Sequence, residues 1–321
     1  MGRSRLLVRQ GPNVGQSRLI PEAKEETPLR LAVEAMGTRF ELVLANPSAK
    51  GIGEMAIERI VEEDARLSAF RRDSLVSLIN RQSWKNPVTV DGEFMDLLLL
   101  CEKINKDSNG AFDPTIGHQM AALGFRGKKA RQKAVNYREG IEKKDTAVNG
   151  FPLLHLNPKE GTVYSESSDL KLDLGAVGKG WALDMAAEIL KAEGVETALL
   201  HGGTSTVVAL GHPPNNPSGW KIKTRKLHSG SNGVVNLRDA ALSVSACDGR
   251  TTKYGDKEIG HVLDPRSGKP VPEPRAAIAI ANSAAVADAW STALLVLGEP
   301  PPDMPLHMAQ VSSQFRTMHK P

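Results

Sequence analysis

Cysteine and aromatic residues are scarce in this sequence of 321 residues. The two cysteines, Cys101 and Cys247, are too few for a disulfide framework and lack the spacing of a zinc site. We therefore expect two free thiols in a reducing compartment. Aromatic side chains make up 4% of the chain, which argues against the ring-rich surfaces that stack single-stranded bases. The formal net charge of +4 suits a small anionic ligand as well as nucleic acid and decides little. We predict no nucleic-acid partner.

Long apolar runs are also missing. No stretch approaches the about 18 apolar residues of a membrane span, so we do not expect the chain to cross a membrane. The first 20 residues hold four arginines and no acidic residue, but they lack the apolar core of a secretory signal. We therefore predict a disordered N-terminal lead over residues 1–30 and a cytoplasmic location.

The remaining sequence predicts a single large α+β domain over residues 31–298. A hydrophobic content of 40% is enough for a substantial core. Apolar periodicity predicts a strand at 38–46 and helices at 53–70 and 92–110. The first helix is expected to bury one side, formed by Met55, Ile57, Ile60, Val61 and Leu67. Many short strands follow without the strict alternation of a doubly wound sheet. A basic insertion is predicted at 127–150 and a C-terminal tail at 299–321.

The segment AVADAWSTALLVLG (285–298) predicts a helix that carries oxygen-bearing side chains. Asp288 and Thr292 are four residues apart, so they lie on the same side of a helix, one turn apart. Carboxylate and hydroxyl oxygens suit Mg²⁺, which uses few protein carboxylates and often completes its shell with substrate phosphates. A purely structural role is the alternative, because Asp favours helix N-caps and Thr often bonds back to its own helix. The spacing alone leaves both open.

The stretch LDLGAVGKGWALD (172–184) predicts a strand, a glycine-rich turn and a helix. Gly175, Gly178 and Gly180 would let the backbone approach a ligand closely, and a helix start offers free amide groups. Lys179 adds a cation, so the turn suits a pyrophosphate. The order of the glycines matches neither the dinucleotide-binding fingerprint nor a Walker motif. A plain tight turn with an exposed lysine is the alternative.

Three further motifs place polar residues at turns. HGGTST (201–206) has paired glycines between strands, which by itself indicates a bend. NGAFDPT (109–115) indicates a turn fixed by Pro114. GHVLDPRSGKPV (260–271) places His261 three residues before an Asp-Pro turn. A histidine there is suited to act as a general base near neutral pH, or it is structural.

Taken in this order, the motifs resemble the ApbE family of flavin transferases, the FAD:protein FMN transferases. The resemblance covers about residues 31–298. It rests on MGTRF at Met36, LSAFRRDSLVSLIN ending at Asn80, GAFDPT, LDLGAVGKGWALD, the Gly202-Gly203 pair, LSVSA, HVLDPRSGKPV and ADAWSTALLVLG.

The resemblance implies a T-fold-related α+β architecture of mixed sheets flanked by helices. It also implies an enzyme that binds FAD and Mg²⁺, transfers the FMN half of FAD to a Thr or Ser hydroxyl of an acceptor flavoprotein, and releases AMP. Acceptors of this family are typically subunits of membrane redox complexes, the sodium-pumping NADH:quinone reductases (Nqr) and their Rnf-type relatives. Family members are often periplasmic or lipid-anchored, in contrast to the location expected above.

Carried over motif by motif, the resemblance assigns three groups of residues. The catalytic base would be His261. The metal ligands would be Asp288, Thr292 and the backbone carbonyl of Ala176. The flavin and nucleotide contacts would be Met36, Phe70, Ala111, Phe112, Asp113, Asp173, Lys179 and Leu263.

Two positions depart from the family pattern. Val244-Ser245-Ala246 stands where Thr-Ser-Gly is common, and Thr204 stands where an acidic residue often follows the paired glycines. The same site also suits two alternative functions. One is an FAD pyrophosphatase, in which water replaces the acceptor hydroxyl, and the other is a flavin-binding protein without turnover.

Overall fold

The structure is a computed structural model of the chain. It describes residues 27–122, 150–224, 233–247, 251–254, 257–260, 262–271, 275–302, 304 and 308–312. His261 and nearly all of the predicted basic insertion lie outside these residues.

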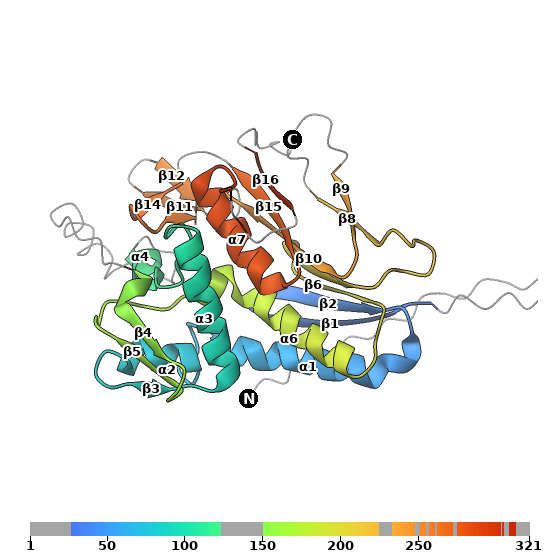
Figure 1. The fold of residues 1–321 in the computed structure, drawn as a ribbon, viewed down its shortest axis with the longest axis horizontal. Helices are drawn as coiled ribbons and strands as arrows, with labels where there is room; N and C mark the ends of the chain where they lie inside the picture. Colours follow the sequence, from blue (N-terminus) through green and yellow to red (C-terminus); the bar gives the residue numbers. More distant parts are fainter. Residues whose placement is uncertain are drawn as a thin grey trace, which may run out of the picture.

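A seven-stranded sheet forms the centre of the fold (Figure 1). Its strand order is β1-β2-β6-β7-β10-β15-β16, and each neighbouring pair is antiparallel. The α+β class is therefore confirmed, with antiparallel pairing where mixed sheets were expected. The strands are β1 (Leu29–Ala35), β2 (Thr38–Leu44), β6 (Ala198–Gly202), β7 (Thr206–Leu210), β10 (Ala240–Ala246), β15 (Ala276–Ala281) and β16 (Met308–Ser312).

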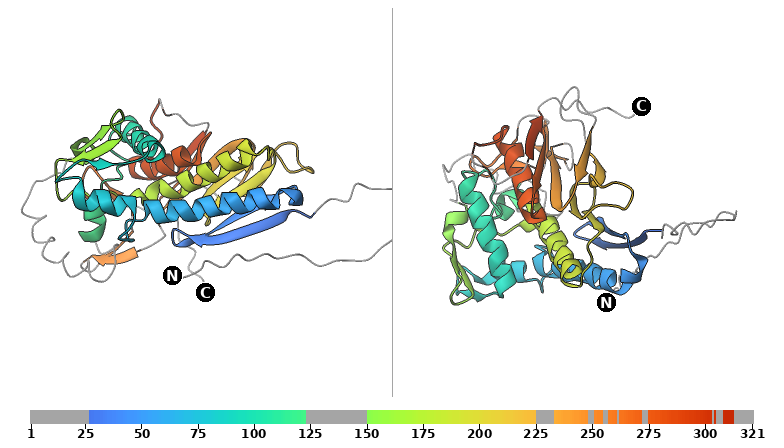
Figure 2. Two further views of the ribbon diagram at one scale, coloured as in Figure 1. Left: turned by 90° about the horizontal axis from the view of Figure 1, so that it is seen from below. Right: turned by 45° about the vertical axis from the view of Figure 1, so that its right-hand side comes forward.

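Three helices cover one face of this sheet, as Figure 2 shows from below. They are α1 (Lys50–Leu67), α6 (Gly178–Ala192) and α7 (Ala284–Leu297). The main core lies between these helices and the sheet. Phe40, Leu42 and Leu44 alternate along β2 and are fully buried, because every second side chain of a strand points to the same face.

The inner side of α1 differs from the predicted side at one residue. Ile57, Ile60 and Leu67 are buried, but Met55 is 50% exposed. Buried positions along the helix are spaced by three or four residues, and Met55 lies two residues before Ile57, on the other side of the helix. Met55 was therefore wrongly placed in the core.

A smaller group of elements lies at one end of the molecule (Figure 1). It comprises α2 (Leu75–Gln82), α3 (Gly92–Asp107) and a three-stranded sheet of β3 (Val88–Thr89), β5 (Thr162–Ser165) and β4 (Leu154–Asn157). Helix α3 packs against α7 and joins this group to the main core.

The remaining elements are short. They are α4 (Gly117–Ala122), the 3₁₀ turns η1 (Pro47–Ala49), η2 (Phe151–Leu153) and η3 (Leu174–Ala176), and the hairpins β8 (Trp220–Lys223) with β9 (Val234–Leu237), β11 (Thr251–Tyr254) with β12 (Lys257–Gly260), and β13 (Leu263–Asp264) with β14 (Lys269–Pro270). Over the described part of the chain, the helices are too short or too polar to span a membrane.

Two segments differ from the sequence prediction. The strand expected before the glycine-rich turn is reduced to an isolated bridge between Lys171 and Ile116. The predicted tail contains β16, which pairs with β15 over Met308–Ser312 and forms an edge of the main sheet. Residues 308–312 are thus part of the sheet, because β15 would otherwise leave its outer hydrogen-bonding groups unpaired there.

Candidate active site

The candidate site is centred on Asp288 in the second turn of α7, where the helix lies over β7 and β10. Asp288 is 3% exposed. It does not cap the helix, because the N-cap is Ser283, whose side chain accepts a hydrogen bond from the Val286 amide. The N-cap interpretation of Asp288 is therefore wrong.

The sheet supplies two hydroxyl groups to this carboxylate. Thr206 on β7 and Ser243 on β10 are direct cross-strand partners, and both are fully buried. Thr206 Oγ1 donates to Asp288 Oδ1 at 3.2 Å, and Ser243 Oγ donates to the same oxygen at 3.0 Å. The antiparallel register thus brings together two hydroxyls that lie 37 residues apart in the sequence.

The start of α6 supplies the remaining donors. The Gly180 amide donates to Asp288 Oδ2 at 3.2 Å. The Lys179 ammonium lies 3.2 Å from Oδ2 and 3.4 Å from Oδ1. A nearly buried carboxylate is costly without hydrogen bonds and an opposite charge, and these groups provide both.

More hydroxyls surround Thr292, the second predicted metal ligand. Ser245 Oγ on β10 lies 2.7 Å from Ser291 Oγ and 3.2 Å from Thr292 Oγ1. Ser291 and Thr292 both donate to the Asp288 carbonyl, at 2.9 and 3.4 Å. The predicted back-bonding of Thr292 to its own helix is therefore confirmed, and the hydroxyl also lies beside the Asp288 cluster.

Close packing of α6 on α7 depends on Gly180. A methyl carbon at this position would lie 2.5 Å from the carbonyl carbon of Ala284 and 2.7 Å from Cα of Ala285. Real Cβ atoms do not approach backbone atoms so closely, so only glycine fits here. The glycine-rich turn thus serves helix packing as well as the donor at Asp288.

Asp184, one turn further along α6, fixes the same contact with the start of α7. Its carboxylate, on α6, accepts hydrogen bonds from Ser283 Oγ and from the amides of Ala284 and Ala285, at 2.7 to 2.8 Å. These are free donors of the α7 N-terminus, where a negative charge is favourable. Burial nevertheless raises the pKa of Asp184 above its ordinary value, against the effect of these three hydrogen bonds.

Three predicted residues lie in the turn that precedes α6. Asp173 caps η3 and accepts from the Gly175 amide at 3.1 Å. Ala176 ends η3, and η3 packs against α7. Lys179 is the second residue of α6 and reaches Asp288 as described. The structure therefore brings Lys179 to Asp288 and places the turn that carries Asp173 and Ala176 against α7.

Asp113 holds its own loop together. One carboxylate oxygen accepts from the amide and the hydroxyl of Thr115 at 2.8 and 2.6 Å, and the other accepts from the Phe151 amide at 3.0 Å. Burial raises the pKa of Asp113, although these hydrogen bonds lower it. The preceding Ala111 and Phe112 are each 1% exposed. The predicted turn is confirmed, while any flavin contact by these residues stays a prediction.

Met36 and Phe70 lie at loops near the ends of β1 and α1. Met36 has a positive φ of 51° and donates its amide to Asp64 Oδ1 at 2.8 Å. Phe70 is 73% exposed, a large apolar ring in contact with solvent. A flavin contact by either residue stays a prediction.

The last motif forms the β13–β14 hairpin. Leu263 is 2% exposed, and Asp264 forms the turn through hydrogen bonds with Arg266. Partial burial raises the pKa of Asp264, but the hydrogen bonds and charge of Arg266 outweigh this effect and hold the pKa below its ordinary value. His261 lies two residues before Leu263 and outside the described residues, so its role stays a prediction.

The structure adds two hydroxyl donors, Thr206 and Ser243, that the sequence analysis does not name as site residues. It also shows that the Gly180 amide donates to Asp288 and that Asp184 accepts hydrogen bonds from the α7 N-terminus. Thr206 and Ser243 belong to the HGGTST and LSVSA motifs, but a motif alone does not disclose which of its hydroxyls faces α7. Within the described residues, no group of three or more His, Cys, Asp or Glu side chains lies together. A metal at Asp288 would therefore depend on hydroxyl, carbonyl and substrate oxygens.

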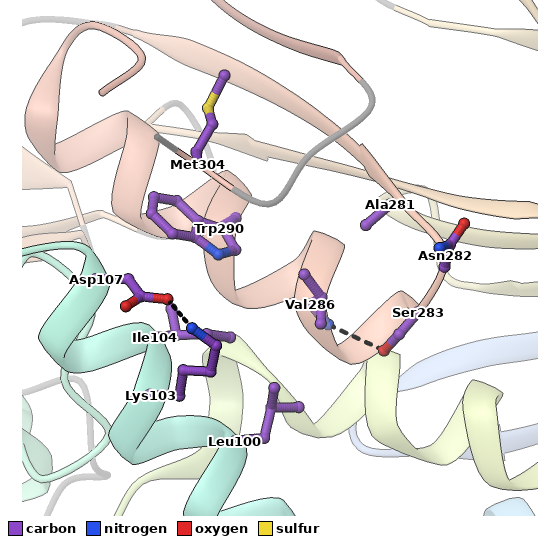
Figure 3. Close-up of a pocket in the computed structure, with 10 residues that line it drawn as sticks. All are labelled: Leu100, Lys103, Ile104, Asp107, Ala281, Asn282, Ser283, Val286, Trp290 and Met304. Carbon is purple, nitrogen blue, oxygen red and sulfur yellow. Dashed lines mark hydrogen bonds and ion pairs between the residues drawn. The ribbon is translucent and has the colours of Figure 1, made fainter. Parts of the chain in front are cut away.

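A separate hollow lies on the other side of α7, between this helix and α3 (Figure 3). Its volume is about 390 Å³. Its lining includes Leu100 and Ile104 from α3 and Val286 and Trp290 from α7. Trp290 is fully buried, and its indole N–H has no hydrogen-bond partner among the described residues. Trp290 lies two residues from Asp288, which places the two side chains on different sides of the helix.

Comparison with known proteins identifies the family to which these motifs belong. The sequence model of the ApbE family matches residues 36–309, which is most of the chain and includes every motif above. The chain belongs to the ApbE family. It is accordingly an enzyme of the transferase class.

Two similar curated proteins share one name. The FAD:protein FMN transferase of Buchnera aphidicola subsp. Schizaphis graminum is 26% identical over 286 residues, which cover 87% of this chain and 83% of that protein. The FAD:protein FMN transferase of Escherichia coli K12 is 26% identical over 276 residues, which cover 83% of this chain and 77% of that protein.

Solved structures have the same fold. The ApbE protein of Thermotoga maritima superposes with a TM-score of 0.74 at 27% identity, covering 85% of this chain and 87% of that chain. The flavinyl transferase ApbE of Pseudomonas stutzeri gives a TM-score of 0.70 at 25% identity, with 84% and 85% coverage.

Proposed function

We propose that this chain transfers the FMN half of FAD to a Thr or Ser hydroxyl of an acceptor flavoprotein, with Mg²⁺ as the cofactor and AMP as the other product. The names of its relatives support flavin transfer. The observation that carries the proposal is the nearly buried Asp288 carboxylate, which contacts the Lys179 ammonium and the Gly180 amide at the start of α6. Thr292 follows one turn further along α7 and bonds to the Asp288 carbonyl.

The donor set is compatible with Mg²⁺. This ion prefers oxygen ligands, uses one or two carboxylates and keeps places for water and substrate phosphates. Asp288 and Thr292 offer such oxygens, and η3, which ends at Ala176, packs against the same helix. When bound, Mg²⁺ would polarise the phosphate oxygens of FAD and stabilise charge on the departing AMP.

The chain's own residues would bind and orient the pyrophosphate. The α6 N-terminus offers free amides and a positive partial charge, and Lys179 adds a full one. Such positioning supplies a large share of the acceleration in phosphoryl transfer, up to roughly 7–11 kcal/mol for a well-aligned pair. Exposed Phe70 and the loops of Met36 and Asp113 would contact the flavin and the nucleotide.

The base in this proposal is His261. It would take the proton of the acceptor hydroxyl, whose oxygen then forms a bond to the FMN phosphorus. The bond between that phosphorus and the bridging oxygen breaks, and the oxygen leaves with AMP. If water took the place of the acceptor, the same site would release free FMN.

We propose that the acceptor is a flavoprotein subunit of a membrane redox complex of the Nqr or Rnf type. The test incubates the enzyme with FAD, Mg²⁺ and a purified Nqr-type flavoprotein subunit. We expect an FMN-sized mass addition on a Thr or Ser of the subunit, with an equal amount of AMP. AMP without modified subunit would indicate a pyrophosphatase, and intact FAD would indicate a flavin-binding protein.

Single substitutions test the roles proposed for Asp288 and His261. Asp288→Ala should abolish the Mg²⁺-dependent modification, whereas Asp107→Ala, at an exposed aspartate on the far side of the α3–α7 hollow, should not. Unchanged modification by Asp288→Ala would remove the metal assignment. His261→Ala should slow transfer far more than it weakens FAD binding, and equal losses would mean that the histidine is structural.

A further inference from the structure

The Asp288 carboxylate already has a cation in front of it. The Lys179 ammonium lies 3.2 and 3.4 Å from the two carboxylate oxygens, so it faces both almost symmetrically. A cation shared between two carboxylate oxygens occupies the side of the group from which a metal ion would also bind.

Lys179 is the counter-ion of this carboxylate. The other groups that donate to the Asp288 side chain within the described structure are two hydroxyls and one backbone amide, which carry no net charge. Asp288 is 3% exposed, and a buried carboxylate without an opposite charge is strongly disfavoured. In this state, Lys179 supplies the positive charge that the site requires.

The Lys179 ammonium is exposed enough to move away from Asp288. Its side chain is 22% exposed, against 4% for that of Asp288. Its hydrogen bonds to described residues both end on Asp288. Long helical side chains lean towards the N-terminus of their helix, so the ammonium lies near the free amides of the α6 N-terminus.

We propose that Lys179 is a surrogate cation, which neutralises Asp288 until a divalent cation binds and displaces it. The two cations repel each other at the distances that sharing one carboxylate imposes, so they exclude each other there. The displaced ammonium then becomes available to an incoming phosphate. This inference rests on the metal ligands of the proposed function and adds a competition that the transferase reaction itself does not require.

The first test measures binding of Mn²⁺ alone, with no flavin or acceptor present, from the electron paramagnetic resonance signal of the free ion. Lys179→Met removes the competing charge, so the Kd for Mn²⁺ should fall by about tenfold. Lys191→Met is the matched control. It removes the same charge from an exposed position of the same helix, about 18 Å further along, and should leave the Kd within about twofold.

The outcome is decided by the comparison. A Kd for Lys179→Met that is unchanged or higher than wild type would overturn the proposal, as would a decrease of the same size in Lys191→Met. The double variant Lys179→Met/Asp288→Ala should bind no Mn²⁺ at the site, and retained tight binding would show that Lys179 competes elsewhere. Because no flavin is present, these results do not depend on whether transfer to an acceptor occurs.

A second test uses the unmodified chain and covers the case in which Lys179→Met does not fold. Lysine amines are acetylated with an N-hydroxysuccinimide ester, and peptides are quantified by mass spectrometry. Addition of Mg²⁺ should speed labelling of Lys179 several-fold, because the amine leaves its ion pair, while Lys191 serves as the internal reference. Unchanged or slower labelling of Lys179 at saturating Mg²⁺ would overturn the proposal.

Discussion

Replacement of Gly180 by alanine should separate α6 from α7. The added methyl group would lie 2.5 Å from the carbonyl carbon of Ala284, and a normal contact requires roughly 1 Å more. Because the neighbour is backbone, a side-chain rotation does not relieve the clash and the helices must move apart. Overpacking of this kind typically costs about 1–3 kcal/mol. Because the clash is with backbone, we expect the upper end of this range, about 3 kcal/mol. The better helix propensity of alanine returns up to about 1 kcal/mol, so we expect a net loss of about 2 kcal/mol.

The assay is urea unfolding followed by circular dichroism at 222 nm. Gly51→Ala provides the matched control, because this glycine also lies in a helix but has no atom within 4 Å of the place that an added methyl group would take. It should be neutral or stabilising by up to about 1 kcal/mol. A Gly180→Ala protein as stable as wild type would refute the argument that glycine is required for the α6–α7 contact. The same substitution should weaken Mn²⁺ binding, because the Gly180 amide that donates to Asp288 moves with the helix.

Three further predictions concern single side chains. Asp184→Ala should lower the free energy of unfolding by about 3–5 kcal/mol, since it leaves two amides and a hydroxyl at the α7 N-terminus without their acceptor; a loss below about 1 kcal/mol in urea unfolding would contradict this role. Burial raises the folded-state pKa of Asp113, so the native state binds a proton that the unfolded state releases, and this residue should make stability decrease as pH rises from its ordinary pKa of 3.8 to the raised one. Asp113→Asn should remove that part of the slope in unfolding measured between pH 4 and pH 7, and an identical slope would show that the carboxyl is not perturbed. Phe70→Ala should change stability by less than about 0.5 kcal/mol, because the ring is 73% exposed, but should weaken FAD binding measured by fluorescence quenching; equal FAD affinity would remove Phe70 from the flavin contacts.

Local patterns predicted much of this architecture. The helical period identified α1, α3 and α7, and the turn residues located most of the short strands. Met55 is exposed because it lies two residues before buried Ile57, roughly 200° around the helix, and hydrophobicity alone does not predict that direction. Strand β16 was missed because its five residues pair only with distant β15, and nothing in the local sequence reveals that partner.

Only the part of the site that depends on local spacing was predictable from the sequence. Asp288 and Thr292 were found from their spacing along one helix, and Lys179 from its place beside glycines. Thr206 and Ser243 reach Asp288 only through the antiparallel register of β7 and β10, across 82 and 45 residues of sequence. Register is fixed by the whole sheet, so a single local motif does not disclose which hydroxyls face the helix.

The carboxylate at the centre of the site gathers its donors from β7, β10 and α6, and it is itself carried by α7. If any of these four segments unfolds locally, the carboxylate loses at least one of its hydrogen-bond donors or its position in the site. Occupancy of the site is thus a reporter of folding across these segments, and an ion bound there would hold together parts of the chain from Gly178 to Leu297. By mass action, a free-ion concentration of a hundred times the Kd of the ion would raise the free energy of unfolding of the domain by about 2.7 kcal/mol.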